Sequence, residues 1–376
     1  MPRGRLKSSD MDFEFSSDAL MLRDMLRRFV EDEAKPLEMK YFSAGGLEEN
    51  ERARLRTVIE QMGLWGITVP EKFGGGGLDM VTACLLEEEL GKTFLPMELG
   101  DVPPLLYGCQ GSQIEKFLNP ALAGKRHPLL AAREPNAFKP EDWKTTATPE
   151  GQAYILNGKK ILSAMPSVQD FFVVLAKAPA GISAFMIEPS QSGVRIVKNG
   201  SVALLLDQCQ IESASLLGEC GQALNLGVEA APAACIRLGA RYVGLSDRLL
   251  DMATSYAKTW VALGALLKER PAVQRMLAEV KVEIESTRWL VYHAAWQTDK
   301  QGSSRPLAAE IRLAVGEMLS KATNLITMIY GGPGPSPQVE IHRYVQSAIP
   351  MDALEFGLEC ARIVIATELL AAANGG

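Results

Sequence analysis

The hydrophobic pattern of this chain changes its period twice, and these two changes constrain the fold more than any other feature. Up to about residue 127, apolar residues recur at the spacing of amphipathic helices. Between residues 128 and 221, short segments rich in β-branched and aromatic residues alternate with turn clusters. From residue 222 onward the helical spacing returns in longer segments. The sequence therefore predicts an α+β multidomain protein divided into residues 1–127, 128–221 and 222–376.

The first region is predicted to be helical. Its apolar spacing predicts helices over residues 16–35, 48–62, 80–90 and 111–118. Ser16 or Ser17 and Asp79 are suitable N-cap residues. We expect the three glutamates at 87–89 on the solvated side of their helix. The four glycines at 74–77 are followed by Leu-Asp and not by the Lys-Ser/Thr of a phosphate-binding loop, so they predict a flexible turn.

The middle region is predicted to be an antiparallel β domain, either a small barrel or a sandwich. Asn157-Gly158 is a typical hairpin turn. The predicted strands are residues 145–148, 153–157, 171–176, 182–187, 194–197 and 202–206.

The third region has the helix lengths of an antiparallel four-helix bundle. The predicted helices are residues 231–258, 271–297, 306–330 and the segment after Pro350.

Composition excludes several classes of function. The chain has 376 residues and a net charge of −6, which gives no general attraction to nucleic acid. No apolar run reaches the length of a membrane span, and the N-terminus lacks the apolar core of a signal peptide. The six cysteines are scattered and the three histidines are far apart, so we expect reduced thiols, no metal site and a cytoplasmic protein.

Residues 322–357 carry the first candidate for catalysis. A helix that ends near Tyr330 is stopped by the sequence GGPGP at 331–335, because proline lacks an N–H donor and glycine accepts the left-handed turn. Glu355 then lies inside an apolar run, residues 353–357. A carboxylate in this position is either a poised base or a solvated helix residue, and the residues themselves leave both interpretations open.

Several local motifs resemble one known family. Residues 66–75, GITVPEKFGG, resemble its segment G…PEEYGG, and Glu134-Pro135 sits where it has the flavin loop TEPxAGSD. Residues 154–160, YILNGKK, match YxLNGxK, residues 217–219 match the end of LLGE, and residues 331–334 match GGxG. With helices, a β domain and a bundle in that order, the chain resembles the acyl-CoA dehydrogenase family.

This resemblance implies a concrete chemistry. Members of the family bind FAD and an acyl-CoA thioester, and a glutamate removes the α proton while the β hydrogen leaves as hydride to the flavin, which gives a 2-enoyl-CoA. Counted from GGxG, that glutamate is Glu355 here. The resemblance assigns the cofactor contacts to Arg133, Glu134, Leu162, Ser163, Ala164, Gly331 and Gly332. It also suggests an electron-transfer flavoprotein as electron acceptor and a flavin site built between subunits.

The chain departs from the family pattern where the flavin is expected to bind. Leu162 and Ala164 replace a tryptophan and a threonine, with Ser163 between them. Residues 260–264, WVALG, replace RxxFG, and Met328 replaces a glutamine. These changes remove a charge, hydrogen bonds and a stacking surface.

Residues 339–344 and Phe356-Gly357 are similar to the divergent subunits of heteromeric acyl-CoA dehydrogenases, as in bacterial steroid side-chain breakdown. Two functions follow from the resemblance. The chain is either an FAD-dependent acyl-CoA dehydrogenase or a flavin-poor, non-catalytic subunit that pairs with an active paralogue. In either case we expect a homodimer, a tetramer or a hetero-oligomer with a paralogue, because the bundle face and flavin site of this family are built between subunits.

Overall fold

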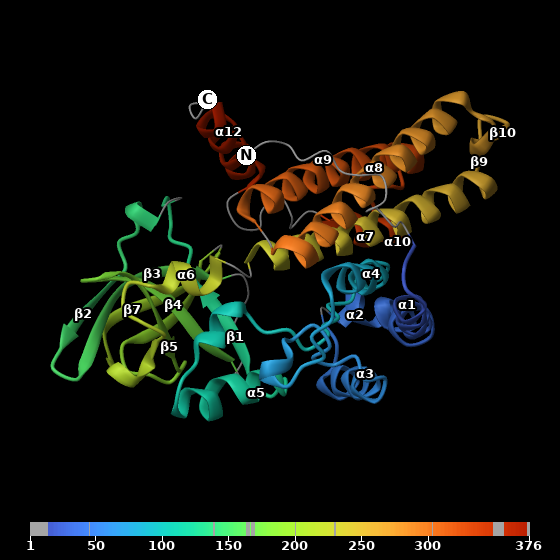
Figure 1. Cartoon of the computed structure of the whole chain (residues 1–376). Coiled ribbons are helices and arrows are strands. Elements are labelled where there is room, and N and C mark those ends of the chain that lie inside the picture. The colour runs from blue at the N-terminus through green and yellow to red at the C-terminus, as the bar shows by residue number, and fades with distance from the viewer. Residues whose placement is uncertain are drawn as a thin grey trace.

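The chain folds into a helical N-terminal part, a central β sheet and a helical C-terminal part (Figure 1). The computed structural model describes residues 14–44, 46–137, 140–162, 166, 170–199, 201–228, 231–302, 304–348 and 357–373. The predicted fold class is confirmed. The predicted divisions after residues 127 and 221 remain predictions; the first strand of the central sheet begins at His127 and its last strand ends at Leu217.

The N-terminal helices begin where polar caps were predicted. Ser16 Oγ accepts a hydrogen bond from Ala19 N at 3.1 Å, and Asp79 Oδ1 accepts one from Thr82 N at 2.9 Å. The elements are α1 (Ser17–Phe29), a π-helix (Val30–Ala34), a 3₁₀ turn (Lys35–Leu37), α2 (Glu38–Ala44), α3 (Glu49–Gln61), a 3₁₀ turn (Glu71–Phe73), α4 (Met80–Leu90), a 3₁₀ turn (Pro104–Gly108), a π-helix (Ile114–Leu118) and α5 (Asn119–Leu122).

The prediction that Glu87–Glu89 face solvent is wrong. Glu87 and Glu89 are buried, and each of the three carboxylates pairs with an arginine from a different helix. The pairs are Glu87–Arg241 at 2.6 Å, Glu88–Arg288 at 3.0 Å and Glu89–Arg27 at 2.7 Å. Ion pairing offsets the desolvation cost of these carboxylates, so a run of acids lies at the junction of α1, α4, α7 (Ala231–Thr259) and α8 (Pro271–Gln301).

The central domain is one mixed sheet, which is open, so the sandwich fits and the closed barrel does not. The strand order is β6-β7-β3-β2-β4-β5-β8, and β1 pairs with β4 in parallel. The strands are β1 (His127–Ala131), β2 (Thr146–Glu150), β3 (Ala153–Leu162), β4 (Asp170–Ala178), β5 (Gly181–Ile187), β6 (Val194–Asn199), β7 (Ser201–Glu212) and β8 (Leu216–Leu217).

The predicted hairpin turn at Asn157-Gly158 is also wrong, because β3 continues through it to Leu162. The turn that joins β2 to β3 lies at residues 150–153, where Gly151 has φ 60°. Gly158 instead marks an irregularity in the pairing of β3 with β7 and has φ 154°. A Cβ at this position would lie 2.7 Å from Thr145 Cα, so glycine is needed for close approach of two strands.

The C-terminal part consists of long helices whose apolar faces form one core. A β hairpin joins α7 to α8 at the end of the bundle that lies away from the sheet (Figure 1). The elements are α6 (Ala223–Val228), α7 (Ala231–Thr259), β9 (Val261–Ala262), β10 (Ala265–Leu266), a 3₁₀ turn (Leu267–Glu269), α8 (Pro271–Gln301), α9 (Arg305–Tyr330), α10 (Glu340–Ala348) and α12 (Gly357–Ala373). None of the helices in the described residues is both long and apolar enough to cross a membrane.

Candidate functional site

Two of the segments expected to contact a cofactor lie next to each other in the β domain. Arg133 is exposed in the loop that follows β1, and Leu162 is the last residue of β3. A backbone hydrogen bond joins the two segments directly, from Ile161 N to Arg133 O at 2.8 Å. The sheet therefore brings together residues that are almost thirty positions apart in sequence.

The Glu134 side chain points into the domain and not toward solvent. Its Oε1 accepts hydrogen bonds from Lys160 Nζ at 2.8 Å and Thr145 N at 3.0 Å, and its Oε2 accepts one from Lys144 N at 2.6 Å. The residue is only 9% exposed. Glu134 therefore anchors the loop between β1 and β2 from inside the domain.

Lys160 completes this buried cluster. Its side chain is fully buried, and its Nζ also donates to Ala132 O at 3.1 Å and lies 4.2 Å from the centroid of the Trp143 ring. Burial alone raises the pKa of Glu134, but the hydrogen bonds from Lys144, Lys160 and Thr145 outweigh it, so the pKa of Glu134 lies below its ordinary value. The carboxylate is thus held in its charged form.

Leu162 is buried within the β domain. It is 5% exposed and belongs to the hydrophobic cluster that contains Leu156, Phe172 and Val174. The structure therefore gives this side chain a packing role, and its contact with a cofactor stays a prediction. Ser163, Ala164 and Glu355 lie outside the described residues, so their predicted roles also remain predictions.

Gly331 and Gly332 follow the end of α9. Gly331 is the C-cap residue and has φ 66°, as expected for a helix stop. The preceding Tyr330 stacks on Tyr256 of α7 with ring centroids 4.1 Å apart, and Tyr256 stacks on Trp260 at 5.2 Å. This stack places the glycine pair at the hairpin end of the bundle.

Three positions that depart from the family pattern, Trp260, Leu263 and Met328, are exposed and apolar, as is Val261 next to Trp260. We call these four exposed residues at the same end of the bundle the hairpin-end patch. Leu263, at the tip of the hairpin, is 98% exposed and has φ 52°. A bulky residue with positive φ and no covering atoms is unusual in a folded chain.

The β-domain segments and the hairpin-end patch lie at opposite ends of one chain (Figure 1). α7 starts next to the β domain and, with 29 residues, is about 43 Å long. The structure therefore brings together Arg133, Glu134 and Leu162, and separately Gly331, Gly332 and the patch, but it does not join the two groups within a single chain.

Lys160 and Trp143 are the residues that sequence reasoning missed. Lys160 is the last residue of the YxLNGxK match, and that motif by itself predicts no role for it. A usable signal was present, because Lys160 occupies the same face of β3 as Leu162, which alternation predicts to be the buried face. A lysine on the inward face of a strand requires a buried partner.

The chain matches two family profiles. "Acyl-CoA dehydrogenase, N-terminal domain" matches residues 16–125, and "Acyl-CoA dehydrogenase, C-terminal domain" matches residues 232–370.

Individual relatives match over nearly the whole chain. (R)-benzylsuccinyl-CoA dehydrogenase of Thauera aromatica is 30% identical and covers 96% of this chain and 97% of its own. The caffeyl-CoA reductase-Etf complex subunit CarC of Acetobacterium woodii is 25% identical over 95% of this chain and 99% of its own. The structure of butyryl-CoA dehydrogenase from Megasphaera elsdenii superposes with a TM-score of 0.82 at 24% identity, and covers 96% of this chain and all of its own. This chain belongs to the acyl-CoA dehydrogenase family.

Proposed function

We propose that this chain is an FAD-dependent acyl-CoA dehydrogenase, which converts an acyl-CoA thioester to the 2-enoyl-CoA. The observation that carries the proposal is the match over 96% of the chain to a relative that is itself named a CoA-ester dehydrogenase. A match of this extent covers all three parts of the fold, including the β domain that lies between the two matched profiles.

The chain's own residues supply binding and proton transfer. The α carbon beside a thioester is a weak acid, so its proton is removed by a positioned carboxylate while donors stabilise the charge that develops on the carbonyl oxygen. We assign the base to Glu355, on the register of the sequence after GGPG. A flavin, when bound, supplies the hydride acceptor that no side chain provides.

The residues present fit one edge of a flavin on the β-domain side. The loop at 132–137 lies beside the end of β3, and its residues Arg133, Pro135 and Asn136 are exposed. We assign the cofactor to this loop together with Leu162, Ser163 and Ala164. At the hairpin end, Trp260 offers an exposed ring, and Lys258 and Lys268 offer exposed positive charge on either side of the hairpin.

A complete site on this plan needs two chains. Gly331 and Gly332 follow α9 at the hairpin end of the bundle, because Tyr330 stacks on Tyr256 in the last turn of α7. The β domain, which carries Arg133 and Leu162, lies at the other end (Figure 1). One flavin therefore reaches both groups only if a second subunit contributes one of them. We therefore propose a homodimer or a larger assembly that packs the hairpin-end patch against a neighbouring subunit. An electron-transfer flavoprotein is the proposed electron acceptor, supported by the relative named as an Etf-complex subunit.

A second candidate function is a flavin-poor, non-catalytic subunit that pairs with an active paralogue. The observation that favours it is the hairpin-end patch. Trp260, Leu263 and Met328 stand where the family pattern has arginine, phenylalanine and glutamine. An apolar surface suits protein–protein contact better than contact with a phosphate.

The test that separates the two candidates is a visible absorption spectrum of the purified chain before and after excess FAD and gel filtration. The dehydrogenase proposal predicts flavin absorption that stays with the protein. A colourless protein that does not retain added FAD contradicts it and favours the paired subunit. Refolding the chain together with a paralogue from the same organism then tests whether a complex retains the flavin.

A further inference from the structure

We infer that Glu134 and Lys160 are positioning residues for the cofactor, and that their buried ion pair sets the spacing between the loop at 132–137 and the end of β3. The inference rests on the proposed function, because those two segments are the ones assigned to the flavin. Neither side chain is proposed to touch the cofactor.

The hydrogen bonds of the pair connect three segments of the chain to one another: the loop at 132–137, residues 144–145 and β3. Glu134 accepts from Lys144 N and Thr145 N, at the start of β2, and from Lys160 Nζ on β3. Lys160 Nζ also donates a hydrogen bond to Ala132 O, two residues before Glu134 in the same loop. A change in either side chain therefore loosens both candidate segments at once.

The packing around the pair allows little movement. Lys160 Nζ is covered by the Trp143 ring, whose own Nε1 is buried without a hydrogen-bond partner among the described residues. Gly158, two residues before Lys160, lies so close to Thr145 that a Cβ would approach Thr145 Cα to 2.7 Å. The pair is therefore held in one geometry by its neighbours.

Stability alone does not account for an ion pair at this place, because burying two charges costs desolvation free energy that apolar side chains would not cost. Replacing a buried pair with apolar side chains of similar volume is often neutral or stabilising, whereas removing one partner leaves a buried charge uncompensated. A directional, charged contact does specify geometry, and a site loses function when its supporting contacts are loose by about 1 Å. Positioning accounts for a pair at this place.

The experiment compares Glu134→Gln, Lys160→Met and the double variant E134Q/K160M with the full-length protein. The control is Glu87→Gln, which breaks a buried glutamate–arginine pair at 2.6 Å between α4 and α7. Three quantities are measured: the dissociation constant for FAD, the positions of the flavin absorption bands, and the amide hydrogen exchange of Lys144, Thr145 and Ile161 in the absence of FAD.

Each single variant is expected to weaken FAD binding by about tenfold or more, to shift the flavin bands, and to speed amide exchange at the three positions. Glu87→Gln is expected to lower the melting temperature while leaving the FAD dissociation constant and the bands unchanged. The double variant leaves no buried charge unpaired, so it is expected to regain thermal stability but not FAD affinity.

Two results overturn the inference and are distinguishable. If the wild-type chain retains FAD and the variants bind it with unchanged affinity and bands, the positioning role is wrong and the proposed function stands. If the wild-type chain itself retains no FAD, both the proposed function and the inference are wrong. The amide-exchange data then show that the pair has a purely structural role.

Discussion

At the scale of single residues, the partner of a buried polar group is often far away in sequence. Tyr344 donates its hydroxyl to the Glu38 carboxylate, with oxygen–oxygen distances of 2.8 and 2.7 Å, across 306 positions. Thr93 Oγ1 donates to the same carboxylate at 2.6 Å. Burial raises the pKa of Glu38, and the hydrogen bonds from Thr93 and Tyr344 oppose that rise. Because its folded-state pKa is raised, Glu38 favours the folded state below its ordinary pKa and that contribution is lost as pH rises through the folded-state value.

Tyr344→Phe is therefore expected to destabilise the protein more at pH 7 than at pH 4. The hydrogen bond from Tyr344 lowers the pKa of Glu38 and therefore stabilises the charged form more than the neutral one. A bond to the charged carboxylate is worth about 1.5–3 kcal/mol and one to the neutral group about 1 kcal/mol, so the loss grows as Glu38 ionises. Urea unfolding of wild type and variant at both pH values measures the difference. An equal or larger destabilisation at pH 4 would show that Glu38 is not charged in the folded protein at pH 7.

At the residue scale, the sequence predicts which segments belong to the candidate site but not which buried side chains pair with each other. Local motifs located Glu134 and the glycine pair, since both lie in short segments that resemble the family. The partner of Glu134 is Lys160 on another strand, and no local pattern pairs the two. The ion pairs of Glu87, Glu88 and Glu89 escape local pattern reading for the same reason, because their arginines come from three other helices.

At the scale of elements, the period of the hydrophobic pattern predicts most helices and six of the eight strands of the central sheet. The two missed strands are short: β1, which pairs in parallel with β4, and β8, with two residues. β1 lacks the alternation of a half-buried strand, and parallel pairing is not local. The Asn157-Gly158 error has a different cause, because glycine at a site of close strand approach looks the same in sequence as glycine in a turn.

Two glycine variants distinguish these roles. Gly158→Ala combines backbone strain with a clash against Thr145, so we expect it to cost about 1–3 kcal/mol from overpacking beyond the strain itself. Gly151→Ala, in the true turn, meets nothing within 4 Å and is expected to cost about 1 kcal/mol from its positive φ alone. Chemical denaturation of both variants gives the comparison, and equal costs would contradict the close approach at Gly158.

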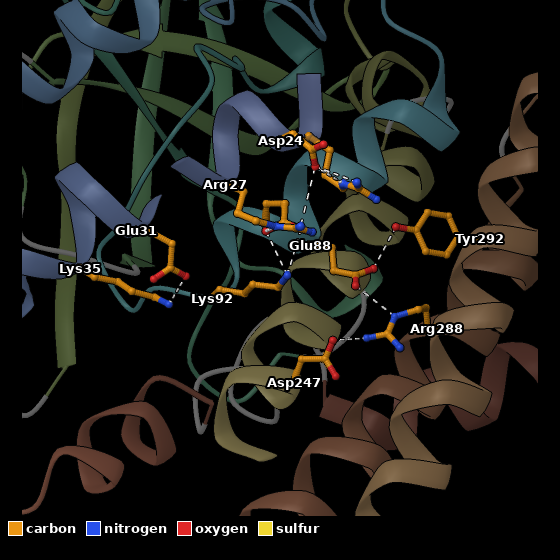
Figure 2. A network of polar contacts seen from close by, with 11 residues as sticks. Asp24, Arg27, Glu31, Lys35, Glu88, Lys92, Asp247, Arg288 and Tyr292 are labelled. Atoms are coloured by element: carbon orange, nitrogen blue, oxygen red, sulfur yellow. Dashed lines mark hydrogen bonds and ion pairs between the residues drawn. The ribbon is translucent and has the colours of Figure 1, made fainter. Parts of the chain in front are cut away.

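At the scale of the whole molecule, α4 joins the N-terminal part to the bundle through a partly buried polar network. Figure 2 shows Glu88 directed toward Arg288 and Tyr292, with Arg288 also reaching Asp247. The Tyr292 hydroxyl donates to Glu88 Oε2 at 2.9 Å. Because these groups come from α4, α7 and α8, the network couples the two helical parts of the chain.

Arg288→Met removes the cation of this network and leaves Glu88 and Asp247 poorly compensated. We expect a loss of about 3–5 kcal/mol in the free energy of unfolding. The matched control is Arg362→Met, which breaks a solvent-exposed pair with Glu317 at 3.0 Å and is expected to cost much less, because solvent screens the two charges. Chemical denaturation compares the two, and similar losses would mean that the network contributes no more than a surface pair.

The hairpin-end patch supports a prediction about assembly. Leu263→Asp changes a side chain that has no covering atoms in one chain, so it is expected to leave the stability of the subunit within about 0.5 kcal/mol. If the patch packs against a neighbouring subunit, the variant elutes at a smaller size in gel filtration and binds FAD more weakly. Met21→Asp, at an exposed position of α1, is the control and is expected to change neither. An unchanged elution volume for Leu263→Asp would place the subunit contact elsewhere.

The most direct test of the proposed dehydrogenase is an anaerobic titration of the FAD-loaded protein with acyl-CoA thioesters, followed by the flavin absorption. The control variants are Glu355→Gln, which removes the proposed base, and Glu359→Gln, which changes an exposed carboxylate paired with Arg362 on α12. We predict bleaching of the flavin in wild type and in Glu359→Gln, and none in Glu355→Gln, with the flavin retained in all three. Bleaching of Glu355→Gln at the wild-type rate would contradict the assignment of the base, and no bleaching of the wild type by any thioester would contradict the dehydrogenase itself.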